Sequence, residues 1–132
     1  MEAPPEIVKH RVLLAEDDET IRHTLQSLLE LKGYAVTHAE NTADTIAFLE
    51  ESDFDLVISD FLMPGGGGRE IVRYLRENGK TAGVIMITGL ADEQLFEEMT
   101  SLGVDRCLRK PFRLASLLET IEELTKGRTA GG

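Results

Sequence analysis

The sequence predicts an α/β domain in which five parallel strands form one doubly wound sheet with helices on both faces. Apolar runs alternate with segments of helical periodicity five times between residues 11 and 126. The connections are a few residues long, and right-handed crossovers then require the strands to run parallel. The runs at 56–59 and 83–87 consist entirely of apolar or small residues, which is typical of strands buried on both faces.

The first half of the chain supplies two strands and two helices. A strand over 12–15 precedes a helix with apolar residues at positions 21, 25, 28 and 29, and Gly33 is expected to end that helix. The strand over 34–39 is more amphipathic, so we expect it near an edge of the sheet. Thr42 is expected to cap the helix that follows.

The second half repeats the alternation. The strand over 56–60 ends at Asp60, and Pro64 opposes helix continuation. The glycines at 65–68 are interpreted as a flexible loop before a helix that carries apolar residues at 71, 72 and 75. We expect the next strand to end at Thr88, a helix over 91–102, an edge strand over 104–108, and a last helix with apolar residues at 114, 117, 118, 121 and 124.

The composition fits one globular domain over 11–126, with a loose lead-in at 1–10 and a flexible tail at 127–132. The 132 residues suffice for one core. The sequence contains no run of about 18 apolar residues, so no membrane-spanning helix is predicted. A single cysteine cannot form an internal disulfide, which agrees with a cytoplasmic location. The net charge of −10 disfavours nucleic acid and suits a protein partner or a bound cation.

Polar residues stand where the predicted strands end, and parallel strands bring those ends to one edge of the sheet. The first strand leads to Glu16 and Asp17, the third to Asp60, the fourth to Thr88 and the fifth to Lys110. Two carboxylates about 4 Å apart repel each other by roughly 4 kcal/mol at an effective dielectric of 20. The cluster therefore requires a cation or a shifted pKa.

The donor set points to magnesium and to phosphoryl chemistry. Oxygen ligands without His or Cys select a hard ion, for which Mg²⁺ is the natural candidate. An Asp carboxylate such as Asp60 can act as a nucleophile and form an acyl phosphate. Lys110 and the ion would neutralise charge on the phosphoryl oxygens, and Thr88 could donate a hydrogen bond to one of them.

Six short motifs, in this order and spacing, carry a family resemblance: LLAEDD (13–18), VISDFLMP (57–64), Gly68, MITG (86–89), GVD (103–105) and KPF (110–112). With them the chain, over residues 11–126, resembles the receiver domain of bacterial two-component response regulators, of the chemotaxis-regulator kind. The resemblance implies a flavodoxin-like strand order, 2-1-3-4-5. It also implies a phosphoprotein that acts in a phosphorelay.

The resemblance assigns a role to each strand-end residue. It implies that a sensor histidine kinase or phosphotransfer protein phosphorylates Asp60, with catalytic help from Thr88 and Lys110. Glu16, Asp17 and Asp60, together with the main-chain carbonyl of Leu62, would hold Mg²⁺. The Lys110–Pro111 bond would be cis. The domain would catalyse its own phosphorylation and dephosphorylation, but mainly it would signal, to a downstream protein or to a domain absent from this chain.

Two departures from the family pattern concern the switch and the lifetime of the acyl phosphate. Cys107 stands where family members usually carry a Tyr or Phe, and it is too small to fill the space of the aromatic ring that usually moves. Leu62 and Leu90, two residues past Asp60 and Thr88, are apolar. They offer no polar group to orient an attacking water, which predicts a long-lived acyl phosphate.

Three other functions were compared with this interpretation. A phosphatase of the haloacid dehalogenase type needs a second Asp two residues after the first, where Leu62 stands. A flavodoxin-like cofactor site needs Ser, Thr or Gly in its first loop, whereas residues 16–18 are acidic. The alternative that stays open is a pseudo-receiver, a protein-interaction module that is not phosphorylated in function, although the complete acidic set argues against it.

Overall fold

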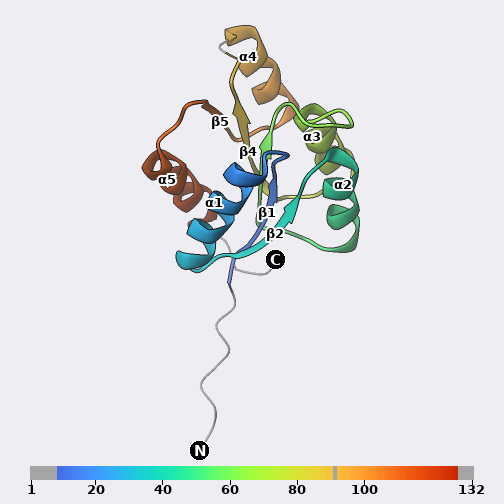
Figure 1. The fold of residues 1–132 in the computed structure, drawn as a ribbon. Helices are drawn as coiled ribbons and strands as arrows, with labels where there is room; N and C mark the ends of the chain where they lie inside the picture. The colour runs from blue at the N-terminus through green and yellow to red at the C-terminus, as the bar shows by residue number, and fades with distance from the viewer. Residues whose placement is uncertain (1–8, 91, 128–132) are drawn as a thin grey trace, which may run out of the picture.

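A computed structural model describes residues 9–90 and 92–127 and shows five strands and five helices that alternate along the chain (Figure 1). In order they are β1 (Arg11–Ala15), α1 (Glu19–Leu31), β2 (Ala35–Ala39), α2 (Thr42–Glu51), β3 (Leu56–Asp60), α3 (Gly68–Glu77), β4 (Gly83–Thr88), α4 (Glu93–Leu102), β5 (Arg106–Arg109) and α5 (Leu114–Thr125). Within the described part of the chain, no helix has the length and apolar character that a membrane crossing requires.

The strands form one parallel sheet in the order β2-β1-β3-β4-β5, which confirms the predicted fold class and strand order. The register pairs Ala15 with Ser59 and Asp60 with Ile87. The last residues of β1, β3 and β4 therefore lie side by side at one edge of the sheet. That edge is the carboxyl edge, where the candidate site was predicted.

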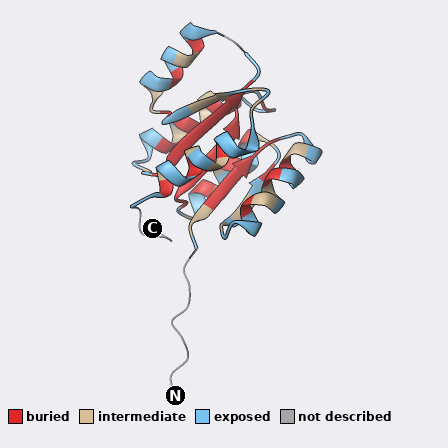
Figure 2. Ribbon diagram, turned by 90° about the vertical axis from the view of Figure 1, so that its left-hand side faces the viewer, coloured by how far each residue is buried: buried red, intermediate tan, exposed pale blue. Residues whose placement is uncertain are grey.

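Two apolar layers hold the sheet, one on each face, and successive residues of a strand face opposite layers. The central strands are buried between the helices (Figure 2). In β1, Leu13 and Ala15 face one layer, whereas Val12 and Leu14 face the other. The first layer takes its helical residues from α2, α3 and α4, and the second takes them from α1 and α5. Burial on both faces explains why the central strands lack polar alternation.

The N-cap of α2 differs from the expectation. Thr42 does not cap α2, because the N-cap is Asn41, whose side chain accepts the N–H of Asp44 at 2.8 Å and donates to its carboxylate. Helix α4 begins at Glu93 with Asp92 as its N-cap, and the expected start at Ala91 lies outside the described residues.

The fifth strand starts later than predicted. Gly103 ends α4 in the left-handed region at φ 105°, and the Val104 N–H donates back to the Met99 carbonyl at 3.0 Å. Val104 thus belongs to the end of the helix, and β5 runs from Arg106 to Arg109. As an edge strand, β5 is only partly covered: its two middle residues are half-buried, and Arg106 and Arg109 are exposed.

The glycines after Pro64 have a steric role that their interpretation as a flexible loop did not include. Gly67 has φ 73° and ψ −154°, a conformation open almost only to glycine. Its N–H donates to the hydroxyl of Thr42 at 2.8 Å, and a Cβ atom added to it would lie 2.2 Å from the carbonyl oxygen of Phe61. The chain can therefore pass this close to the end of β3 only without a side chain.

We predict that Gly67→Ala lowers the free energy of unfolding by about 3 kcal/mol, because it adds a clash to the cost of a positive φ. Gly33→Ala is the matched control, since Gly33 has φ 98° and open space around it. It should cost only about 1 kcal/mol. Urea unfolding of both variants measures the difference, and equal losses would show that the contact with Phe61 does not matter.

Candidate functional site

Three carboxylates meet at the carboxyl edge of the sheet, as the strand ends predicted. Glu16 and Asp17 follow β1, and Asp60 is the last residue of β3. One oxygen from each lies within 4.8 Å of the others. Glu16 and Asp60 are buried, whereas Asp17 is exposed, so the cluster is open to solvent on one side. The neighbouring Asp18 has a different role: it caps α1 by accepting a hydrogen bond from the N–H of Ile21 at 2.9 Å.

Both oxygens of Asp60 have partners. The Lys110 Nζ donates to Oδ2 at 2.7 Å, and the main-chain N–H of Leu62 donates to Oδ1 at 3.2 Å. Lys110 follows β5, and its N–H donates to the carbonyl of Thr88 at 2.7 Å, which fixes its backbone beside the end of β4. The Lys110–Pro111 peptide bond is cis, as predicted.

Glu16 is the most strongly perturbed group of the cluster. Burial, first, and the nearby Asp60 carboxylate raise its pKa to about 8. Its Oε1 is buried without a hydrogen-bond partner among the described residues, and the Lys110 Nζ lies 3.7 Å away. A proton or a cation on this carboxylate would relieve the repulsion.

Lys110 keeps its charge in this setting. Burial opposes the charged form, but the carboxylates of Asp60 and Glu16 outweigh it and raise the pKa of the ammonium group. Thr88 is buried beside it at the end of β4. The Thr88 Oγ1 accepts the N–H of Leu90 at 3.0 Å, which leaves the hydroxyl hydrogen able to donate. All five predicted strand-end residues thus lie at the same edge of the sheet.

Comparison with known proteins assigns the family. A model of the response regulator receiver domain matches residues 12–122. The chain belongs to this family. The response regulator receiver protein CpdR of Brucella abortus is 37% identical over 114 residues, which cover 86% of this chain and 95% of CpdR. The chemotaxis protein CheY of Halobacterium salinarum is 31% identical over 114 residues, with coverage of 86% and 95%.

Longer relatives contain the same domain as one part. The transcriptional regulatory protein ResD of Bacillus subtilis is 32% identical over 116 residues, which are 88% of this chain but 48% of ResD.

Solved structures of receiver domains have the same fold as this chain. The signal receiver domain of the putative LuxO repressor of Vibrio parahaemolyticus has a TM-score of 0.86 at 25% identity and coverage of 90% and 92%. CheY4 of Vibrio cholerae has a TM-score of 0.82 at 29% identity and coverage of 88% and 98%.

Cys107 lies on β5 of this receiver domain and faces α4. Its Sγ is 4.0 Å from the Sδ of Met99, and burial raises the pKa of the thiol. A second contact joins the same elements, because the guanidinium of Arg109 lies over the ring of Phe96, 5.1 Å from its centroid. The place of the usual aromatic residue is thus taken by a small side chain packed against a thioether.

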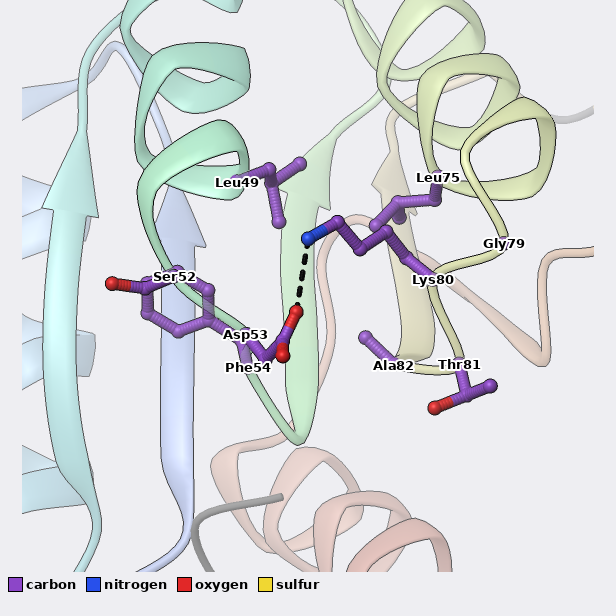
Figure 3. A pocket seen from close by; sticks show the side chains of 9 residues that line it. All are labelled: Leu49, Ser52, Asp53, Phe54, Leu75, Gly79, Lys80, Thr81 and Ala82. Carbon is purple, nitrogen blue, oxygen red and sulfur yellow. Dashed lines mark hydrogen bonds and ion pairs between the residues drawn. The ribbon is translucent and has the colours of Figure 1, made fainter.

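A separate hollow lies at the opposite edge of the sheet, between the loops that precede β3 and β4 (Figure 3). Its charged residues pair with each other, since the Lys80 Nζ is 2.9 Å from the Asp53 carboxylate. Leu49, Phe54 and Leu75 supply apolar lining. None of the strand-end residues lines this hollow.

The sequence did not indicate the contacts of two buried polar residues, Thr42 and Arg22. Thr42 holds Gly67, as described above. Arg22 of α1 is buried and contacts the backbone of Glu16. The sequence did contain a sign that Arg22 is buried. The inward face of the helix carries Arg22, Leu25 and Leu29 at the spacing i, i+3, i+7. A charged residue at such a position calls for a specific partner.

The raised pKa of Glu16 predicts a pH dependence for the metal-free domain. Between pH 4.5 and about 8 the folded state binds a proton that the unfolded state has lost, so thermal stability should fall as pH rises through this window. Glu16→Gln cannot ionise and should flatten the slope.

Melting curves in a chelating buffer from pH 5 to 8.5 measure this slope. Glu51→Gln, an exposed change on α2, should keep the slope of the native protein. If Glu16→Gln kept it as well, Glu16 would not be the group responsible.

Proposed function

We propose that this receiver domain is a phosphoryl-accepting switch in which Asp60 is the acceptor. The observation that carries the proposal is the 2.7 Å contact of the Lys110 Nζ with Asp60 Oδ2, inside a cluster of three carboxylates. An acidic crevice with one ammonium group is poorly suited to bind a free anion. It is well suited to receive a phosphoryl group together with a cation.

In the proposed reaction, a carboxylate oxygen of Asp60 attacks the phosphorus of a phosphohistidine on the partner. An O–P bond forms as the N–P bond breaks, and the electron pair of the broken bond stays on the imidazole nitrogen, which takes a proton from solvent. Lys110 offsets charge on the phosphoryl oxygens. The Thr88 hydroxyl donates a hydrogen bond to one of those oxygens. Lys110 and Thr88 both contact the phosphoryl group in this way and respond to its presence.

The residues of the crevice fit a magnesium ion. They offer three carboxylate oxygens within 4.8 Å of one another, and the buried Glu16 Oε1 has no hydrogen bond in the described part of the chain. Oxygen donors of this kind suit a hard cation. Glu16, Asp17, Asp60 and the Leu62 carbonyl would hold the ion. When bound, it would supply positive charge that screens the carboxylates and the incoming phosphoryl group.

The proposal includes partners on both sides of the switch. The phosphoryl donor is a sensor histidine kinase or a histidine phosphotransfer protein, as expected for a receiver domain. The output is contact with a downstream protein, or with a further domain as in relatives of the length of ResD. A cytoplasmic location completes the proposal and agrees with the single thiol of Cys107.

We predict that incubation with acetyl phosphate and Mg²⁺ adds the mass of one phosphoryl group to the intact protein, and that Asp60→Asn abolishes the adduct. Omission of Mg²⁺ should reduce the yield strongly. Asp18→Asn is the matched control: its carboxylate caps α1 and lies outside the cluster, so the adduct should persist. A native protein that stays folded and forms no adduct would instead favour the pseudo-receiver, a binding module without phosphorylation.

We predict a long-lived adduct, with loss over minutes or longer. Leu62 and Leu90 are exposed beside the ends of β3 and β4, and neither side chain can orient an attacking water. Leu62→Asn supplies a polar group and should shorten the lifetime several-fold. The control Leu31→Asn, on an exposed leucine at the far end of α1, should leave it unchanged. Loss of the native adduct within seconds would contradict the prediction.

A further inference from the structure

Arg22 is a charged residue inside the molecule, close to the candidate site but outside the cluster. Only 9% of its surface is exposed. Its Nη1 donates to the main-chain carbonyl of Glu16 at 3.0 Å, and its Nη2 lies 3.2 Å from the Glu40 carboxylate. The guanidinium thus extends from the first turn of α1 and joins the loop after β1 to the loop after β2.

The ion pair with Glu40 does not by itself account for a buried arginine. The side chain of Glu40 is 62% exposed, and pairs with so exposed a partner contribute little. Burial of a guanidinium is costly unless its donors are satisfied. The same face of α1 carries Leu25 and Leu29, so an apolar side chain would pack at this position without that cost. The contact with the Glu16 carbonyl is what an apolar residue could not supply.

That contact orients the peptide unit between two of the clustered carboxylates. The Glu16 N–H donates to the Ala39 carbonyl at 3.0 Å, so the backbone of Glu16 is held on its amino side by β2 and on its carboxyl side by Arg22. The carbonyl of Glu16 and the N–H of Asp17 belong to one planar peptide. Arg22 therefore fixes the plane from which both side chains depart.

We propose that Arg22 is a positioning residue, which holds the Glu16–Asp17 peptide so that both carboxylates can serve one bound cation. The inference rests on the proposed function, because it concerns the same site. A positioning role and a purely electrostatic role predict opposite effects of removing Arg22 on cation affinity. A positive charge near the cluster weakens cation binding, so its removal would strengthen binding, whereas loss of a positioning contact weakens it.

The test is a titration of isotope-labelled protein with Mg²⁺ alone, followed by the amide NMR shifts of Glu16, Asp17 and Asp60. We expect Arg22→Gln to raise the dissociation constant roughly tenfold, the size of effect known for residues that orient metal ligands. Arg22→Lys retains one donor for the carbonyl and should recover part of the loss. At saturating Mg²⁺, the rate of phosphorylation by acetyl phosphate should return to within about twofold of the native rate, because the reacting groups are intact.

Two variants control for charge and for the ion pair. Arg73→Gln removes an exposed arginine of α3 that pairs with Glu70 at 2.9 Å, and it should leave Mg²⁺ affinity unchanged. Glu40→Gln breaks the ion pair with Arg22 and spares the carbonyl contact, so it should change the affinity less than twofold. If Arg22→Gln did not fold, Arg22→Met, which has no donor for the carbonyl and suits the apolar face of α1, would replace it in the same titration.

Each outcome of the titration supports or overturns the positioning role. Equal or tighter Mg²⁺ binding by folded Arg22→Gln, or by Arg22→Met where Gln does not fold, would overturn it. A tenfold loss in Glu40→Gln would also overturn it, because the ion pair would then account for the effect. Absence of Mg²⁺ binding by the native protein would instead contradict the proposed function, which separates the two failures.

Discussion

The repulsion between three carboxylates at one edge of the sheet is the constraint on which the rest of the structure depends. Glu16, Asp17 and Asp60 would separate if their backbones could move. They are held by the ends of two adjacent strands whose side chains are buried on both faces. Rigid packing of the sheet therefore keeps the carboxylates together despite their repulsion. Lys110 offsets part of their negative charge, and a bound proton or cation can offset the rest.

Hydrogen bonds between side chains and the main chain help to hold the loops at the carboxyl edge. Arg22 holds the loop after β1, and Thr42 holds the glycine segment after β3 through Gly67. Each contact joins a side chain of one loop or helix to the main chain of another. Loops at the carboxyl edge are thus supported by hydrogen bonds between a side chain of one segment and the main chain of another.

The sequence was sufficient for the fold class and the strand-end residues, because each depends on a local signal, whereas the strand order came from the family resemblance. Apolar runs predicted β3 and β4, and the polar residue after each run predicted its place at the carboxyl edge. What the sequence could not supply were contacts between distant segments. The bond from Gly67 to Thr42 spans 25 residues, and neither residue alone indicates it. Gly67 looked flexible because glycine permits many conformations, whereas here a close approach to Phe61 requires its small size.

The ends of the described domain lie away from the reactive edge. Arg11 begins β1 at the amino edge of the sheet, and near the close of α5 Leu124 lies beside Gly83, the first residue of β4. Sequence joined to either end would therefore emerge on the side opposite Asp60. A label, a surface tether or a fused domain attached there would leave the acidic crevice facing away from the attachment point and open to a visiting protein.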